Sequence, residues 1–251
     1  MLPGVYAAAA GMITQRERLD VIANNLANVS TAAFKRSEPI SRGFYQVFTE
    51  EIGRFPGIRG SMDVPGGGVV LDATDEDLSP GPIVETGNPL DLALENSGFF
   101  VIDTPQGERY TRAGNFSLNS FGQIVTQNGH PVLGQRGPIL AQGESIQISP
   151  NGDVLVDGDA VDKILLMDFI RPYELTKYGE NLYGASEEMR QIQSTVVETN
   201  VRVGALEQSN VNPITELTLL MDTARSYEAH QRVIAAFDEL LDSAVNDIAR
   251  V

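Results

Sequence analysis

The sequence predicts an α+β fold in which N- and C-terminal helices pack as a coiled-coil-like pair, with a central antiparallel β domain. Two observations predict the helices: apolar residues recur in heptads near each end of the chain. A third predicts the β domain, because the middle is rich in Gly and Pro and alternates with period two. We therefore divide the 251 residues into helix 1–36, extended connector 37–84, β domain 85–203 and helix 204–251.

The first helix is expected from about Val5 to Val29, where apolar positions step by three and four residues without a slip. Its seam consists of Val5, Ala8, Met12, Gln15, Leu19, Ile22, Leu26 and Val29. Three asparagines, Asn24, Asn25 and Asn28, are the notable polar residues of this helix. Their amides could hydrogen-bond across helix contacts or at the helix end, or they could simply supply capping and surface polarity. The sequence leaves both interpretations open.

The second helix is expected to begin after Asn212, a good N-cap, with Pro213 in the first turn. One row of seven-residue spacing contains Leu220, Tyr227, Ile234, Leu241 and Ile248, and a second contains Thr223, His230, Phe237, Ala244 and Val251. A narrow stripe of this kind favours packing of one helix on another, within a subunit, between subunits, or both. The alternative is an amphipathic helix that lies on its own globular core.

The middle of the chain reads as short strands joined by frequent turns. Two Asn-Gly pairs, at 128–129 and 151–152, separate apolar segments, and we expect type I′ hairpin turns at both. Residues 54–82 are less regular and contain a glycine triplet at 66–68, so we expect an extended connector there.

Composition excludes several classes of function. The net charge of −16 disfavours nucleic-acid binding and docking on anionic lipid. The chain has no Cys and only two His, which argues against metal sites and thiol chemistry. No apolar run approaches the roughly 18 residues that a membrane-spanning helix needs, so we expect no membrane insertion. No Lys or Arg precedes the apolar start, as a conventional secretory signal would require.

No motif singles out a catalytic, cofactor-binding or metal-binding residue. The glycine triplet lacks the Lys-Ser/Thr of a phosphate loop, and Asp72–Asp77 lacks the Gly and Glu of a calcium loop. His130 lies in an expected turn without a nucleophile elbow elsewhere in the sequence. We therefore predict no enzyme and no cofactor, and a carboxylate-dependent hydrolase is the least favoured alternative.

Three separate motifs go beyond composition. They are LDVIANNLANVST at 19–31 with FKR at 34–36; TGNPLDLAL at 86–94 with GFFV at 98–101 and YTRAGNF at 110–116; and LEQSNVN at 206–212. In this order they resemble the signatures of the bacterial flagellar rod and hook (axial) protein family, most closely its basal-body rod proteins. The chain length favours a rod subunit over the usually longer hook proteins. The compact middle and the long last helix resemble the proximal rod type, which we favour, whereas the N-terminal signature is close to that of the distal type.

The resemblance implies a structural subunit that polymerises through its terminal helices into the hollow drive shaft for motility. The partners it implies are the chain itself, other flagellar rod proteins and the flagellar type III export apparatus. It implies a location in the basal-body rod, in the periplasmic space, reached without a cleaved signal peptide. A distal rod or hook subunit is the alternative within the family, and an extracellular binding module with helical stalks is the alternative outside it.

The subunit-interface residues that we expect are the helix seams and the asparagines between them. They are Val5, Ala8, Met12, Gln15, Leu19, Ile22, Asn24, Asn25, Leu26, Asn28, Val29, Leu220, Tyr227, Ile234, Phe237, Leu241, Ala244 and Ile248. Isolated amphipathic helices are marginal in water, so we also expect both termini to be largely disordered before assembly.

Overall fold

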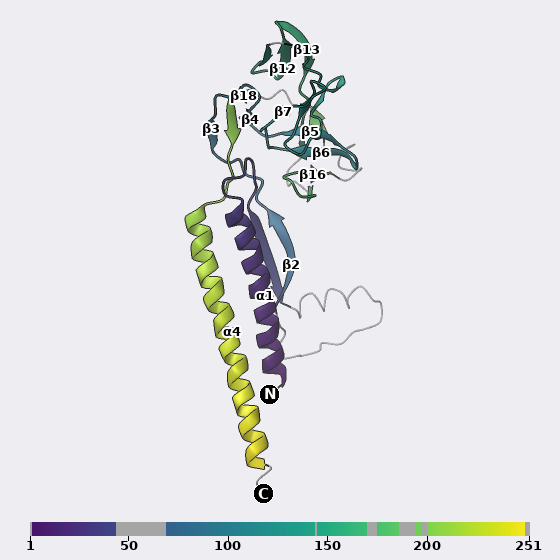
Figure 1. Ribbon diagram of the computed structural model, residues 1–251. Coiled ribbons are helices and arrows are strands. Elements are labelled where there is room, and N and C mark those ends of the chain that lie inside the picture. Colours follow the sequence, from purple (N-terminus) through teal and green to yellow (C-terminus); the bar gives the residue numbers. More distant parts are fainter. Residues whose placement is uncertain are drawn as a thin grey trace, which may run out of the picture. The chain divides into compact units, whose positions relative to one another are not determined.

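The computed structural model describes residues 2–43, 69–143, 145–169, 175–185, 194–196 and 200–248 (Figure 1). The chain divides into two compact units. The first unit consists of residues 1–27, 36–77 and 212–251, and the second consists of residues 28–35 and 78–211. The predicted α+β class is confirmed, because terminal helices pair in the first unit and antiparallel strands build the second.

The first unit contains both long helices. Helix α1 (Leu2–Ala27) and helix α4 (Pro213–Ile248) lie side by side and run in opposite directions (Figure 1). Strands β1 (Ser37–Gly43) and β2 (Val69–Glu76) form an antiparallel ladder, with a register shift after Ile40, and both contact α1. These strands fall in the stretch expected as a connector, whose glycine triplet at 66–68 lies outside the described residues.

Local hydrogen bonds mark the start of α4 and the turn that follows the end of α1. The side-chain oxygen of Asn212 accepts hydrogen bonds from the backbone N–H of Ile214 at 3.0 Å and of Thr215 at 3.4 Å. This confirms Asn212 as the N-cap of α4, with Pro213 at the first helical position. Helix α1 ends at Ala27, two residues before the predicted end, and a turn follows in which Thr31 N–H donates to the Asn28 carbonyl at 3.1 Å.

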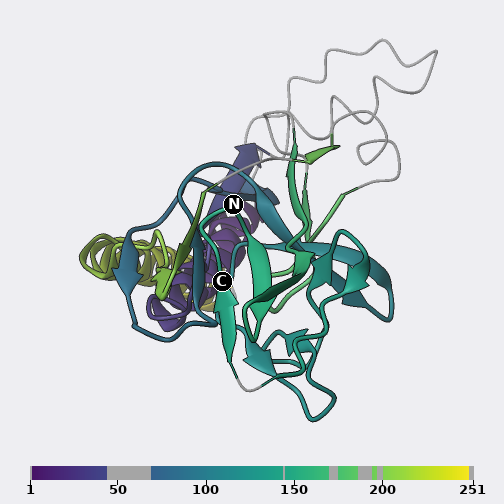
Figure 2. The ribbon, with the colours of Figure 1, turned by 90° about the horizontal axis from the view of Figure 1, so that it is seen from above.

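The second unit is built from short antiparallel strands (Figure 2). Its largest sheet has the order β15 (Thr176–Lys177), β16 (Tyr183–Gly184), β6 (Gly107–Thr111), β5 (Phe99–Thr104), β14 (Leu166–Phe169) and β17 (Ser194–Val196). A second sheet joins β11 (Ile146–Ile148), β12 (Asp153–Val156) and β13 (Asp159–Lys163). The remaining pairs are β3 (Ile83–Glu85) with β19 (Ala205–Glu207), β4 (Leu92–Leu94) with β18 (Val201–Val203), β7 (Ser117–Leu118) with β8 (Ile124–Val125), and β9 (Leu133–Gly134) with β10 (Gly137–Pro138).

Strand β5 lies at the centre of the core of this unit. Successive side chains of a strand point to opposite faces of the sheet. Phe100 and Ile102 therefore join one hydrophobic cluster, while Phe99 and Val101 join another. Burial of both faces explains why this strand is a continuous apolar run and shows no alternation.

The two Asn-Gly turns are not of the expected type I′. That type needs positive φ at both central residues. Here only the glycines have it, with φ of 83° at both Gly129 and Gly152. Hydrogen bonds from Gly129 N–H to the Thr126 carbonyl and from Gly152 N–H to the Ser149 carbonyl instead close four-residue turns. The glycine then supplies the left-handed position that follows a type I turn in longer hairpin loops.

Candidate functional site: the paired helices and two buried ion networks

Small residues of α1 let α4 approach closely. A Cβ atom added to Gly4 would lie 2.9 Å from Cζ of Phe237, and one added to Gly11 would lie 2.8 Å from Cε1 of His230. The two contacts are seven residues apart on each helix and advance in opposite directions. The helices therefore pack antiparallel in a heptad register, which the apolar seam alone did not reveal.

Most of the predicted interface residues are buried or partly buried in the first unit, which contains this helix pair. Buried among them are Ala8, Ile22 and Asn25, and the partly buried ones are Val5, Met12, Gln15, Leu19, Leu26, Leu220, Tyr227, Ile234 and Phe237. Asn24 and Leu241 are exposed, and Asn28 and Val29, which are partly buried, belong to the second unit. The side chains of Ala244 and Ile248 lie outside the described residues. Most of the predicted seam is thus at least partly covered within one chain.

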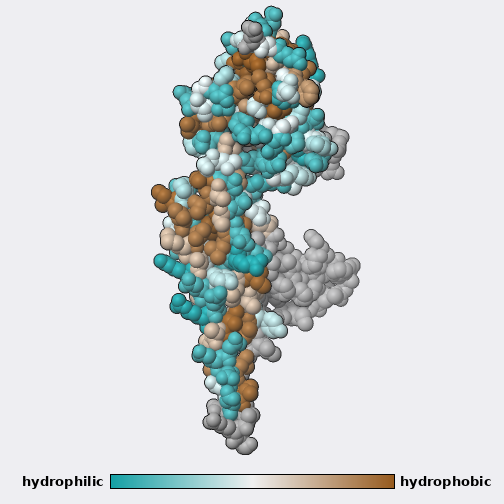
Figure 3. All heavy atoms as spheres, in the orientation of Figure 1, coloured by the Kyte–Doolittle hydropathy of each residue, from teal (hydrophilic) through white to brown (hydrophobic). Residues whose placement is uncertain are grey.

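Apolar side chains remain exposed on the outer faces of both helices, after this pairing. On α1, Tyr6 and Ile13 are seven residues apart and 72% and 60% exposed. On α4, the exposed large apolar residues are Ile214, Leu217, Met221, Val233, Leu240, Leu241 and Val245. Figure 3 shows hydrophobic surface along this helical unit. Exposed apolar residues gathered in this way, as opposed to scattered singly, mark interaction surfaces.

The first ion network surrounds Glu216, in the first turn of α4. Its carboxylate accepts a hydrogen bond from Arg36 Nε at 2.6 Å and from Asn25 Nδ2 at 3.3 Å. Asn25 also pairs with the backbone of Ser37, donating to its carbonyl at 2.9 Å and accepting from its N–H at 3.0 Å. Both Asn25 and Glu216 are only 1% exposed. One asparagine therefore ties α1 to α4 and to β1.

Arg36 is held charged by its carboxylate neighbours. Partial burial on its own would lower the pKa of Arg36, but the hydrogen bond and charge of Glu216, with the charge of Glu38, outweigh it. The net result is a raised pKa. The guanidinium also forms a salt bridge with Glu38.

The second ion network surrounds Glu207, at the end of β19. Lys35 Nζ lies 2.5 Å from Glu207 Oε1, and Arg112 Nη1 lies 3.2 Å from Oε2. The N–H of Gly81 donates to the same carboxylate at 2.9 Å. All three charged side chains are buried, and Lys35 and Glu207 are 0% and 1% exposed. The sequence indicated Lys35 only as part of a motif and gave no sign of these partners.

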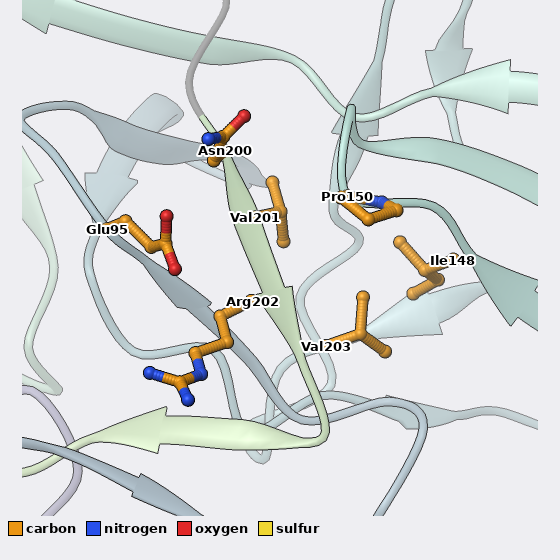
Figure 4. A pocket seen from close by; sticks show the side chains of 7 residues that line it. All are labelled: Glu95, Ile148, Pro150, Asn200, Val201, Arg202 and Val203. Atoms are coloured by element: carbon orange, nitrogen blue, oxygen red, sulfur yellow. The ribbon is translucent and has the colours of Figure 1, made fainter.

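A surface groove of about 450 Å³ lies beside β18 in the second unit. Figure 4 shows Glu95 and Arg202 on one side of this strand, and Ile148 and Pro150 on the other. Arg202 donates to Glu85 at 2.9 Å. Glu95 is the single carboxylate among the residues that line the groove, and the lining contains no His, so it offers no pair of carboxylates of the kind a glycoside hydrolase uses.

The described residues hold no group of three or more His, Asp or Glu side chains arranged to bind a metal ion. Neither α1 nor α4, over its described length, has an apolar window long enough to cross a membrane. His130 lies partly exposed in its turn, with Nε2 3.9 Å from Oε2 of Glu180. The candidate functional features are accordingly the paired helices of the first unit and the two buried ion networks, one in each unit.

Comparison with known proteins agrees with this architecture. Three family models match: "Flagella basal body rod protein" over residues 5–35, "Flagellar hook protein FlgE/F/G D1 domain" over 93–156, and "Flagellar basal body rod FlgEFG protein C-terminal" over 202–247. The first covers most of α1 with Lys35, and the last contains Glu207, Glu216 and most of α4.

Full-length relatives extend the match across the chain. The flagellar basal-body rod protein FlgF of Caulobacter vibrioides is 32% identical, covering 98% of each chain. FlgG of Bacillus subtilis is also 32% identical, over 98% of this chain and 99% of its own. The flagellar hook-basal body complex protein FlhO of Bacillus subtilis is 30% identical over the whole of both chains. The chain therefore belongs to the family of flagellar basal-body rod proteins, which are structural components of the flagellum.

Proposed function

We propose that this rod subunit polymerises through the outer faces of α1 and α4. The observation that carries the proposal is the apolar surface that these helices keep after pairing with each other: Ile214, at 75%, is the most exposed large apolar residue of α4. In this proposal the predicted seam holds α1 and α4 together within a chain, which leaves the outer faces available to other subunits.

The outer patches suit an open-ended assembly. Tyr6 and Ile13 lie on α1, whereas Ile214, Leu217 and Met221 form an i, i+3, i+7 row on α4. A contact between unlike patches on neighbouring copies does not need to close on itself, and repeating it generates a helical filament. Burial of these side chains between copies would supply the free energy of assembly.

The wider setting is part of the proposal. We place the chain in the rod within the periplasmic space, with other rod proteins as neighbours, delivered by the flagellar type III export apparatus without a cleaved signal peptide. The relatives named as rod and hook-basal body complex proteins support the neighbours. A purely structural role without catalysis is part of the proposal, and it fits the groove beside β18, whose lining contains the single carboxylate Glu95 and therefore no carboxylate pair. The compact middle and the long last helix support the proximal position, and complementation of strains that lack either FlgF or FlgG tests it.

The disorder expected for both termini before assembly stays a prediction. The pairing of α1 with α4 within one chain gives each helix a partner without a second subunit, which favours protection of both. Hydrogen exchange on dilute protein decides between the two: fast exchange throughout α1 and α4 means that the helices wait for neighbours, and slow exchange means that the pair forms alone.

Substitution on the outer face of α4 tests polymerisation. Leu217→Asp places a charge in a surface that assembly would bury, so we expect loss of motility and of rod assembly in a complementation strain. Ser226→Asp introduces the same charge at another exposed position of α4 and serves as the matched control. Circular dichroism of both purified variants should show unchanged helix content. Normal motility of the Leu217→Asp strain would exclude this face as an assembly surface.

A further inference from the structure

Segment 33–35 is held by groups that lie far away in sequence. The N–H of Ala33 donates to the backbone carbonyl of Glu207 at 2.8 Å, and Lys35 Nζ donates to the Ser79 carbonyl at 2.6 Å. The Lys35–Glu207 ion pair joins residues 172 positions apart. A local turn hydrogen bond, from Phe34 N–H to the Thr31 carbonyl, adds to these long-range contacts. The order of this segment therefore depends on later parts of the chain.

Burial couples Lys35 closely to Glu207. Both side chains are almost fully inaccessible to solvent, and Arg112, a second cation, binds the same carboxylate. A buried ammonium group without its carboxylate is strongly unfavourable. Without Glu207, burial of the Lys35 ammonium group is therefore unfavourable. The segment that carries Lys35 is then more stable exposed to water than packed in the folded unit.

Arg36, the residue after Lys35, also pairs with a buried carboxylate, and this pair lies in the first unit. Arg36 binds Glu216, and Asn25 of α1 binds the same carboxylate. Consecutive cations in the N-terminal region are thus each matched by a buried carboxylate from the C-terminal region, at positions 207 and 216. Two independent contacts, one in each unit, make the same connection between the two ends of the sequence.

We infer that Lys35 and Arg36 form a charge clasp with Glu207 and Glu216, which makes the order of residues 28–37 conditional on the chain from 205 to 216. Before residues 205–216 are in place, residues 28–37 of the N-terminal signature therefore stay unfolded. The biological use of the clasp rests on the proposed function: in a subunit exported before it folds, the signature stays unfolded until almost the whole chain has been delivered. The physical coupling itself does not depend on export.

Hydrogen exchange on the full-length chain tests the clasp. Glu207→Gln keeps the shape of the side chain but removes the carboxylate charge that Lys35 binds. We expect exchange of the amides in 28–35 to rise at least about tenfold, while β5 and β6 keep their wild-type rates. Glu216→Gln should do the same for Ser37, whose N–H is held by Asn25. Glu180→Gln, at an exposed carboxylate, is the matched control and should change neither segment.

A paired substitution separates charge from shape. Lys35→Met with Glu207→Met removes both ions, so protection of 28–35 should recover relative to Glu207→Gln. Unchanged exchange of 28–35 in Glu207→Gln would overturn the clasp, and so would equal loss of protection in β5 and β6, because the ion pair would then support the whole β unit. These readouts need no assembly, so a wild-type chain that fails to restore motility would refute the proposed function and leave the clasp to stand on its own result.

Discussion

His230 of α4 packs directly over Gly11 of α1, so that a Cβ at position 11 would lie 2.8 Å from the ring. The clashing atom is the far end of a side chain that can shift, and alanine raises helix propensity by about 1 kcal/mol over glycine. We expect Gly11→Ala to change the free energy of unfolding by less than about 1 kcal/mol. Gly11→Val cannot be accommodated in this way and should cost about 1–3 kcal/mol by overpacking.

Thermal unfolding of the full chain, followed by circular dichroism, checks this order. Ala23→Val, at an exposed position of α1, controls for the poorer helix propensity of valine. Addition of His230→Ala to Gly11→Val should recover most of the lost stability, since it removes the ring that clashes. A Gly11→Val chain as stable as the control would contradict the close packing.

Asn25 and Asn24 are neighbours of the same type in very different surroundings. Asn25 is buried and bonded to Ser37 and Glu216, whereas Asn24 is exposed. Asn25→Ala removes both hydrogen bonds to the backbone of Ser37 and the bond to Glu216, and we expect it to cost about 2–4 kcal/mol. Asn24→Ala should stay within about 0.5 kcal/mol. Urea unfolding of both variants measures the difference, and equal costs would mean that the Asn25 bonds add nothing.

This pair of residues also shows where sequence reasoning stops. Heptad periodicity correctly predicted both helices, and Asn212 correctly marked the start of α4. The same pattern could not say which of three asparagines faces the partner helix. The hydrogen bond from Asn25 to Glu216 joins residues 191 positions apart, and only the fold brings them together.

Two further features, the glycine contacts between the helices and the buried charges around Glu207, could not be predicted from the sequence for physical reasons. A search for apolar repeats passes over glycine, so Gly4 and Gly11 gave no signal, although they set the distance between the helices. Charged residues are normally expected in solvent, so nothing in the sequence indicated that Lys35, Arg112 and Glu207 are buried together. The turns at the Asn-Gly pairs were placed correctly but assigned to the wrong type, because loop length also decides the backbone conformation.

Gly114 occupies a position in the β unit where no side chain fits. A Cβ atom there would lie 1.7 Å from the backbone oxygen of Leu92, which cannot move without breaking the hydrogen bond from Leu92 N–H to the Gly114 carbonyl. We expect Gly114→Ala to cost about 3 kcal/mol or more, measured by urea unfolding.

Gly129 provides the comparison, because its surroundings are open and its positive φ is one that asparagine tolerates. Gly129→Asn should therefore cost less than about 1 kcal/mol, since the turn keeps its conformation. If Gly114→Ala were as mild as Gly129→Asn, the β unit would have to relax around Leu92, contrary to its tight packing.

Leu26 tests whether the seam itself is needed for a working rod. This side chain is partly buried in the first unit, so Leu26→Asp brings a carboxylate into a partly buried position that an apolar side chain now fills. We expect the helix pair to open and motility to be lost. Ala23→Asp adds the same charge to an exposed position of the same helix and should keep motility. Swimming assays in a complementation strain, with hydrogen exchange of α1 and α4 in parallel, distinguish the causes. Loss of protection together with motility assigns Leu26 to the intrachain seam, loss of motility alone assigns it to contacts between subunits, and normal swimming means that the seam prediction is wrong at this position.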